Sequence, residues 1–259
     1  MKIDLHNHTI LCNHAEGSVS EYVEAAIGAG CEVFGFSDHA PMRYDPKYRM
    51  SFEQMSLYEG WVRDARDKYA DKIDVVLGYE VDFLDGYMDE RVLKADVDYL
   101  IGSVHFIDDW GFDNPEFIGR YSDVDINELY IKYFSLIEQM AYSGLFDIVG
   151  HLDLLKVFRF LPTKDIRVLA KDALKAIKKS DIVVELNVAG YRKPIAEPYP
   201  SPHLLEEMAN MDIPITFGSD AHKPEQVAMF SDEIESLARS FGYSKCAMFK
   251  NRDRAMVRF

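Results

Sequence analysis

The stretch Ile3–His14, IDLHNHTILCNH, is a short apolar segment followed by three of the chain's eight histidines. Residues i and i+2 of an extended chain point to the same side, so His6 and His8 can contact one cation. The same pattern recurs along the chain, where a β-branched apolar run is followed by His, Asp or Glu and then by a helical segment. This repeated unit decides the fold that we predict.

Seven strands alternate with seven helices in this pattern. The expected strands are Ile3–His6, Val33–Ser37, Ile73–Tyr79, Tyr99–Val104, Asp147–Gly150, Ile182–Leu186 and Pro214–Gly218. The expected helices are Val19–Gly30, Phe52–Tyr69, Asp89–Lys94, Ile126–Ser143, Asp165–Lys179, Pro202–Asn210 and Glu225–Phe241. Ser18 and Asp125 precede two of these helices as N-caps.

Uninterrupted β-then-α units favour parallel strands covered by helices, because each helix returns the chain to start the next strand in the same direction. We expect an α/β barrel rather than an open sheet, since no GxGxxG or GxxxxGK[ST] turn follows any strand. No linker or repeat divides the chain, so residues 1–259 are predicted to form a single domain. The tail, Ser244–Phe259, is expected to form a final short element.

Composition and charge limit the range of possible functions. The formal net charge of −15 repels polyanions and argues against a nucleic-acid-binding surface, so an anionic substrate would need a local reversal of charge. The three cysteines form no CxxC pair, which indicates neither a disulfide framework nor a thiolate zinc site. No secretory signal or membrane-spanning apolar run is recognisable, so the cytoplasm is the expected location and no membrane partner is expected.

Ligand-type side chains gather at the strand ends. A single histidine at such a position is more often a core residue than a ligand, but six of seven strand ends carry His, Asp or Glu. The carboxyl ends of barrel strands converge on one face, where active sites of this architecture lie. The candidate ligands are His6, His8, His14, His39, Glu80, His105, His151, Asp220 and His222.

Nine nitrogen and oxygen ligands without thiolates suit Zn, Mn or Fe, and they are too many for one ion. Two or three ions that share carboxylates are therefore expected, an arrangement that serves hydrolysis of phosphoesters or amides. Asp38 is next to a candidate ligand, His39, and is predicted to orient a liganding ring rather than to bind metal itself.

The ordered motifs HxH, a following His14, SDH at residues 37–39, Glu80, GSVH, GH and SDAH resemble the polymerase-and-histidinol-phosphatase (PHP) family of metal-dependent phosphoesterases. The resemblance runs from His6 to His222, and no ligand position of the family pattern is missing. It implies a distorted, TIM-like (β/α)7 barrel that holds three divalent metal ions.

The resemblance also implies a role for each ligand. The first ion is assigned to His6, His8, Glu80 and Asp220, the second to Glu80, His105 and His151, and the third to His14, His39 and His222. Glu80 would bridge the first two ions. Glu80, Asp220 and His222 are also the predicted catalytic residues.

Two phrases, GSVHFID at 102–108 and ELNVAGYRKP at 185–194, resemble the histidinol-phosphate phosphatases of this family. That branch implies hydrolysis of L-histidinol phosphate, in histidine biosynthesis, by a hydroxide that bridges metal ions. Arg192 and Arg159 match its two phosphate-binding arginines, although Lys156 and Arg167 could compete for the role of Arg159. The loop 107–121 is either an acidic and aromatic rim for the organic half of the substrate or ordinary loop surface.

Two other functions stay open at this point. One is another PHP phosphoesterase that acts on nucleotides or single-stranded nucleic acid, because the metal ligands are shared across the family. The other is a metal-dependent binding protein without catalysis, although the complete ligand set and both arginines favour an enzyme. The sequence does not fix the oligomeric state.

Overall fold

The computed structural model describes residues 1–259, and its centre is a sheet of seven parallel strands. In sheet order the strands are β1 (Ile3–Asp4), β2 (Val33–Phe36), β3 (Asp74–Asp82), β4 (Tyr99–Ser103), β7 (Ile148–Val149), β8 (Val183–Asn187) and β9 (Ile215–Gly218). The sheet closes between its first and last strands, where Leu5 N donates to Phe217 O at 2.9 Å and Asn7 bridges Ala221. The predicted α/β barrel is therefore confirmed.

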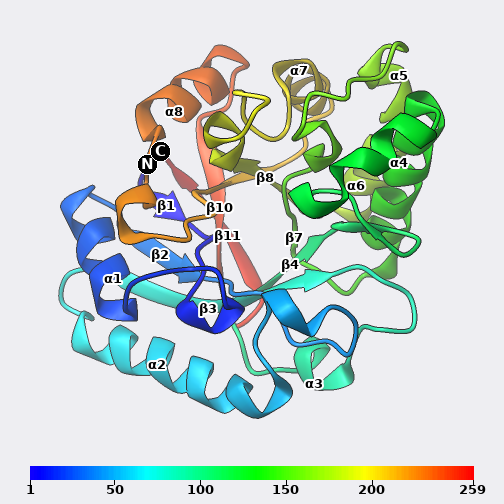
Figure 1. Cartoon of the computed structure of the whole chain (residues 1–259). Coiled ribbons are helices and arrows are strands. Elements are labelled where there is room, and N and C mark those ends of the chain that lie inside the picture. The colour runs from blue at the N-terminus through cyan, green and yellow to red at the C-terminus, as the bar shows by residue number, and fades with distance from the viewer.

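Helices surround this barrel (Figure 1). They are α1 (Val19–Gly28), α2 (Met55–Lys68), α3 (Glu90–Leu93), α4 (Ile126–Ser143), α5 (Ile166–Leu169), α6 (Lys171–Ser180), α7 (Pro202–Asn210) and α8 (Ser231–Ser240). Ser18 caps α1 in a reciprocal capping box with Glu21, and Asp125 accepts two backbone N–H groups at the start of α4, so both predicted N-caps are confirmed. None of the helices is both long and apolar enough to span a bilayer.

Two helix boundaries were predicted wrongly. The expected helix Asp165–Lys179 is divided into α5 and α6, which meet at Ala170. The expected helix Glu225–Phe241 starts later, because Ala228 and Phe230 have φ angles of 53° and 61°, in the left-handed region that helices do not use.

Tyr99 lies in the barrel interior, and its position explains why two neighbouring residues are glycines. Its hydroxyl donates to Leu5 O at 2.6 Å, which ties β4 to the end of β1 across the barrel. A Cβ on Gly35 would lie 2.2 Å from this hydroxyl, and a Cβ on Gly78 would lie 2.6 Å from the ring. Neither position can carry a side chain while Tyr99 occupies this space.

The chain ends in a hairpin, β10 (Lys245–Lys250) and β11 (Asp253–Arg258), which is the predicted final element. Its turn binds residues that precede two barrel strands: Asn251 N donates to Asp98 Oδ1 at 3.1 Å, and Arg252 pairs with Asp147. The hairpin therefore covers the amino-terminal end of the barrel. The opposite end, where the strands finish, is left for the candidate site.

Candidate metal centre

All nine predicted ligands lie together at the carboxyl ends of the strands. Glu80, on β3, is at their centre and is only 1% exposed. Its Oε2 lies 3.3 Å from His6 Nε2 and 3.0 Å from His39 Nδ1, while its Oε1 lies 2.9 Å from His151 Nε2 and 3.5 Å from His105 Nε2. One carboxylate thus faces two separate sets of imidazoles, as a bridging ligand would.

Four groups of side chains have ligand atoms close enough to share an ion, and three of these groups consist only of predicted ligands. These three are His6, His8 and Glu80; Glu80, His105 and His151; and His14, His39 and His222. Asp220 joins the first group, since its Oδ1 lies 3.2 Å from His8 Nε2. These groups coincide with the three sets expected from the resemblance, although which ion each residue binds stays a prediction.

The residues between the ligands explain how the local chain presents them. Thr9 caps a short 3₁₀ helix, Ile10–Cys12, and Asn13 follows with a φ of 68°. This turn brings His14 back over the site, with His14 Nδ1 held 2.8 Å from Cys12 O. After β9, Asp220 adopts a φ of 50°, and Asp220 N donates to His6 O at 2.7 Å. Asp tolerates this left-handed conformation better than most residues.

Unpartnered ring nitrogens show that the site suits cations. His222 Nε2 and His151 Nδ1 are buried without a hydrogen-bond partner in the protein, and Nε2 of His6 and His8, although beside the Glu80 and Asp220 carboxylates, makes no hydrogen bond of good geometry. Buried polar atoms are normally paired, so several orphaned imidazole nitrogens in one place indicate an absent ligand. Neutral imidazole and carboxylate form the donor set that Zn, Mn and Fe accept.

The pKa shifts of the clustered side chains also indicate a site for cations. Burial alone would raise the pKa of Glu80, but His6, His39 and His105 outweigh it and hold this pKa well below the ordinary value. Burial opposes protonation of His8 and His105, yet the neighbouring carboxylates raise the pKa of His8 to about 9 and of His105 to about 10. Without metal, the ionised carboxylates therefore hold protons on imidazoles, and divalent cations would replace those protons.

Asp38 lies behind the ligands and contacts the ring of His8, whereas its neighbour His39 contacts it only through the backbone. Its Oδ1 lies 3.3 Å from His8 Nδ1 and accepts the backbone N–H of His39 at 2.8 Å. Its Oδ2 accepts the N–H and the hydroxyl of Thr9. The contact with His8 Nδ1 leaves Nε2 directed at the site, which is how a carboxylate orients a liganding histidine.

Sequence reasoning missed two further carboxylates. Asp82 Oδ1 lies 2.8 Å from His105 Nδ1, and Glu185 Oε1 lies 2.7 Å from His6 Nδ1. Both could have been noticed in the sequence. Asp82 is two residues from Glu80 and shares its face of β3, and Glu185 is the only charged residue in a fully buried strand.

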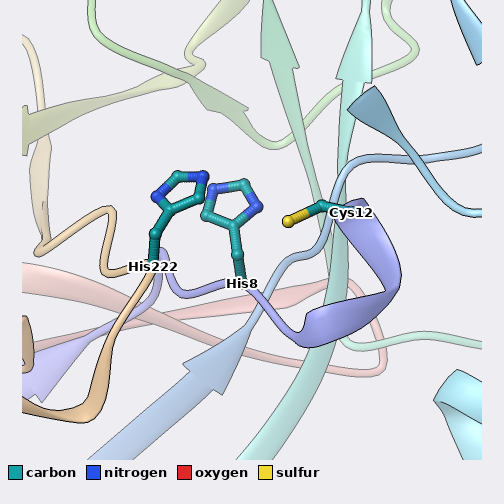
Figure 2. Close-up of side chains that lie close together, drawn as sticks. All are labelled: His8, Cys12 and His222. Carbon is teal, nitrogen blue, oxygen red and sulfur yellow. The ribbon is translucent and has the colours of Figure 1, made fainter. Parts of the chain in front are cut away.

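Cys12 is close to the ligands without completing the set. The Cys12 thiol lies within 4.8 Å of ligand atoms of His8 and His222. In Figure 2, however, the ring of His8 stands between the thiol and the ring of His222. An ion held by the two imidazoles would be shielded from the sulfur by the His8 ring. Burial also raises the pKa of the Cys12 thiol far above that of a free cysteine, which disfavours the thiolate.

The ligands open into a cavity of about 350 Å³ that Arg192 also lines. Arg192 Nη2 donates to Ser219 O at 2.7 Å and to Asp220 O at 2.9 Å, while its buried Nη1 has no partner. Two backbone carbonyls thus anchor the guanidinium and leave Nη1 free for a ligand in the cavity.

Arg159 lies elsewhere. Its side chain is exposed and is not among the residues that line this cavity. The two possible competitors are also occupied: Lys156 is buried against Glu197 and Asp153, and Arg167 pairs with Asp165. Lys193, which the sequence did not single out, lines the cavity beside Arg192.

A second cavity, of about 500 Å³, adjoins the first and shares His14, His39, His105, Asp113 and Lys193 with it. Part of its lining comes from the loop 107–121, so this loop borders the site. The acidic and aromatic residues in the lining are Tyr44, Asp45, Tyr48, Phe106, Asp109, Asp113, Glu116 and Phe117.

The barrel and its cluster of imidazoles and carboxylates define a (β/α)-barrel protein with a site for divalent metal ions. The PHP domain model matches residues 4–189, and the chain belongs to the PHP family.

Similar proteins cover nearly the whole chain. A protein of Deinococcus radiodurans named "Probable histidinol-phosphatase" is 42% identical over 240 residues, which is 90% of this chain and 92% of that protein. The "Histidinol-phosphatase" of Bacillus subtilis is 29% identical, over 87% of this chain and 95% of its own length. The histidinol phosphate phosphatase of Lactococcus lactis, solved with zinc, L-histidinol and phosphate, matches 98% of each chain with a TM-score of 0.80 and 22% identity, which supports the fold.

Proposed function

We propose that this protein is a metal-dependent phosphomonoesterase that hydrolyses L-histidinol phosphate to L-histidinol and phosphate. The observation that carries the proposal is the free Nη1 of Arg192, which lines one cavity together with Glu80, Asp220 and the liganding histidines. Full-length similarity to proteins named histidinol-phosphatase supports this substrate. That residues 1–259 form one phosphoesterase domain remains a prediction.

The proposed cofactor is a set of three divalent ions, with Zn, Mn or Fe as candidates. When bound, such ions lower the pKa of water toward about 7 and neutralise phosphate charge. The protein's part is to hold the ligands rigidly: Glu80 between two sets of imidazoles, and Asp220 by the contact of its Oδ2 with Asn187 Nδ2 at 3.2 Å. We keep Glu80, Asp220 and His222 as the proposed catalytic residues.

Arg192 is proposed to bind the phosphate. Its two carbonyl contacts fix the guanidinium before substrate arrives, so little side-chain entropy is lost on binding. A charge-assisted hydrogen bond of this kind contributes about 1.5–3 kcal/mol. Arg159 remains the second proposed phosphate ligand, and from its exposed position it must reorient to reach the cavity.

The second cavity suits the organic half of the substrate. The amine and imidazole of histidinol phosphate are cationic or hydrogen-bonding groups, and acidic and aromatic side chains bind such groups. Asp113 is the best placed, since it lines both cavities and the structure gives it no ion-pair partner. Burial raises the pKa of Asp113, and a bound cation would oppose that shift.

The proposal is tested by measuring phosphate release from L-histidinol phosphate, p-nitrophenyl phosphate and a nucleoside monophosphate after loading with Mn or Zn. A cleavage assay on single-stranded DNA runs in parallel. We expect L-histidinol phosphate to be hydrolysed far faster than the others; equal slow rates, or DNA cleavage, would favour a different PHP activity.

Variants at the arginines separate phosphate binding from general damage. Arg192→Ala should lower kcat/KM roughly 10- to 100-fold, because it removes the contact estimated above at about 1.5–3 kcal/mol. Arg159→Ala should cost less than Arg192→Ala, and Arg167→Ala, in an exposed pair with Asp165, is the matched control. An Arg192→Ala enzyme with full activity would remove this residue from the proposed site.

A further inference from the structure

Glu185 lies on β8, the one barrel strand whose end carries no predicted metal ligand. Its side chain is buried, with 1% of the residue exposed, and its hydrogen bonds go to two predicted ligands, His6 and His151, and to Asn187. Oε1 lies 2.7 Å from His6 Nδ1. Oε2 accepts the backbone N–H of His151 at 2.9 Å and Asn187 Nδ2 at 3.1 Å.

The two histidines that Glu185 contacts belong to different groups of ligands. His6 is grouped with His8 and Glu80, whereas His151 is grouped with Glu80 and His105. Because the contact with His6 engages Nδ1, the ring presents Nε2 to the site, 3.3 Å from Glu80 Oε2. The contact with His151 fixes its backbone instead. One carboxylate therefore sets the position of a ligand in each group.

The neighbouring strand leaves room for this carboxylate. A Cβ on Gly218, which pairs with Asn187 of β8, would lie 1.9 Å from Glu185 Oε1 and 2.6 Å from His6 Cβ. The φ of Gly218 is not in the left-handed region, so space rather than backbone conformation requires glycine here. The close approach of Glu185 to His6 is thus part of the packing of three strands.

Asp82 provides a comparison. It also holds a liganding ring, with Oδ1 2.8 Å from His105 Nδ1, but its other oxygen accepts a hydrogen bond from Arg49 and contacts no second ligand. Asp82 therefore acts on one group of ligands and Glu185 on two.

We propose that Glu185 is a positioning residue that supports ion binding both by the His6–His8–Glu80 group and by the Glu80–His105–His151 group. It does so through the His6 ring and the His151 backbone and does not itself bind an ion. Carboxylates that orient metal-binding histidines typically contribute a factor of about 10–100 in metal affinity. This inference rests on the proposed metal centre but not on the substrate.

The test is Glu185→Gln, which keeps the side-chain size but offers one acceptor oxygen to the three donors, His6 Nδ1, His151 N and Asn187 Nδ2, that now share two oxygens. Ion content is counted by elemental analysis, and zinc affinity is measured by competition with a chelator. In Glu185→Gln two ions should bind about 10- to 100-fold more weakly, whereas in Asp82→Asn only one should. The His14–His39–His222 group should keep its ion in both variants.

Two results would overturn the proposal: Glu185→Gln with unchanged affinity for every ion, or with weaker binding of a single ion. Nitrogen NMR of the metal-free wild-type protein gives a second readout that does not depend on the variant folding. It should show His6 protonated at Nδ1 with a hydrogen bond to Glu185, and its absence would equally contradict the inference. If the expected changes in ion affinity were found but the wild-type protein hydrolysed no L-histidinol phosphate, the proposed function would be refuted and the role of Glu185 would stand.

Discussion

Arg49→Met isolates a buried ion pair behind the metal centre. Arg49 lies in the loop between β2 and α2 and is 5% exposed. Its Nη1 donates to Asp82 Oδ2 at 2.7 Å and its Nε donates to Asp45 O at 2.8 Å. Asp82 in turn holds His105, so the variant removes one of the two cations next to a carboxylate that is 4% exposed, and only the protonated His105 ring stays beside it.

The expected loss follows from that burial. Removing one partner of a buried pair costs up to about 3–5 kcal/mol, and here the charge left on Asp82 keeps only the His105 imidazolium as its partner. For a domain of this size about 1 kcal/mol corresponds to roughly 2–4 °C, so Tm should fall by up to about 6–20 °C. Methionine keeps most of the arginine stem volume, so loss of packing should contribute little.

The assay is urea unfolding of the metal-free protein at pH 7, with Arg49→Met, Asp82→Asn and the double variant. The double variant should recover part of the loss, because the neutral amide that replaces the Asp82 carboxylate needs no cation beside it. A loss below about 1 kcal/mol for Arg49→Met, or a double variant whose loss equals the sum of the two single losses, would refute this reasoning.

Three other perturbations test the metal centre and the core. Glu80→Ala should remove ions and turnover together, because Glu80 faces both sets of imidazoles; elemental analysis that still finds full metal would contradict its bridging role. Gly218→Ala should destabilise the protein and weaken zinc binding, since its Cβ would collide with Glu185, and chelator competition would reveal unchanged affinity if this is wrong. All three cysteines are buried, and burial raises the pKa of two of them to about 12, so a thiol reagent at pH 8 should label none in the native protein and three after unfolding.

Most of the fold and the set of metal ligands could be predicted from local sequence patterns. Each strand end could be identified from its own apolar run and the polar residue after it, as with Glu80 after Ile73–Tyr79 or Asp220 after Pro214–Gly218. Parallel topology then brings those ends together, so nine ligands could be predicted to meet without any knowledge of side-chain geometry.

The parts that sequence did not predict depend on contacts between distant segments. Glu185 is 179 residues from His6, and nothing near either residue indicates that their side chains meet. The start of α8 was predicted wrongly. Ala228 N donates to Ser219 Oγ at 2.7 Å, and this contact between residues nine positions apart accompanies a turn where a helix was expected. The position of Arg159 likewise depends on the path of its loop, which no local pattern specifies.

The two adjoining cavities resolve the conflict between an acidic protein and an anionic substrate. The smaller cavity combines Arg192 and the proposed divalent ions, so its local charge is positive at contact distance even though the chain carries −15 overall. The larger cavity keeps the acidic character of the chain through Asp113 and its neighbours. A substrate with a phosphate at one end and a cationic group at the other therefore fits in one orientation only. We expect Asp113→Asn to raise KM for L-histidinol phosphate while leaving KM for p-nitrophenyl phosphate, which has no cationic group, within about twofold; an equal rise for both would show that the larger cavity does not select the organic half.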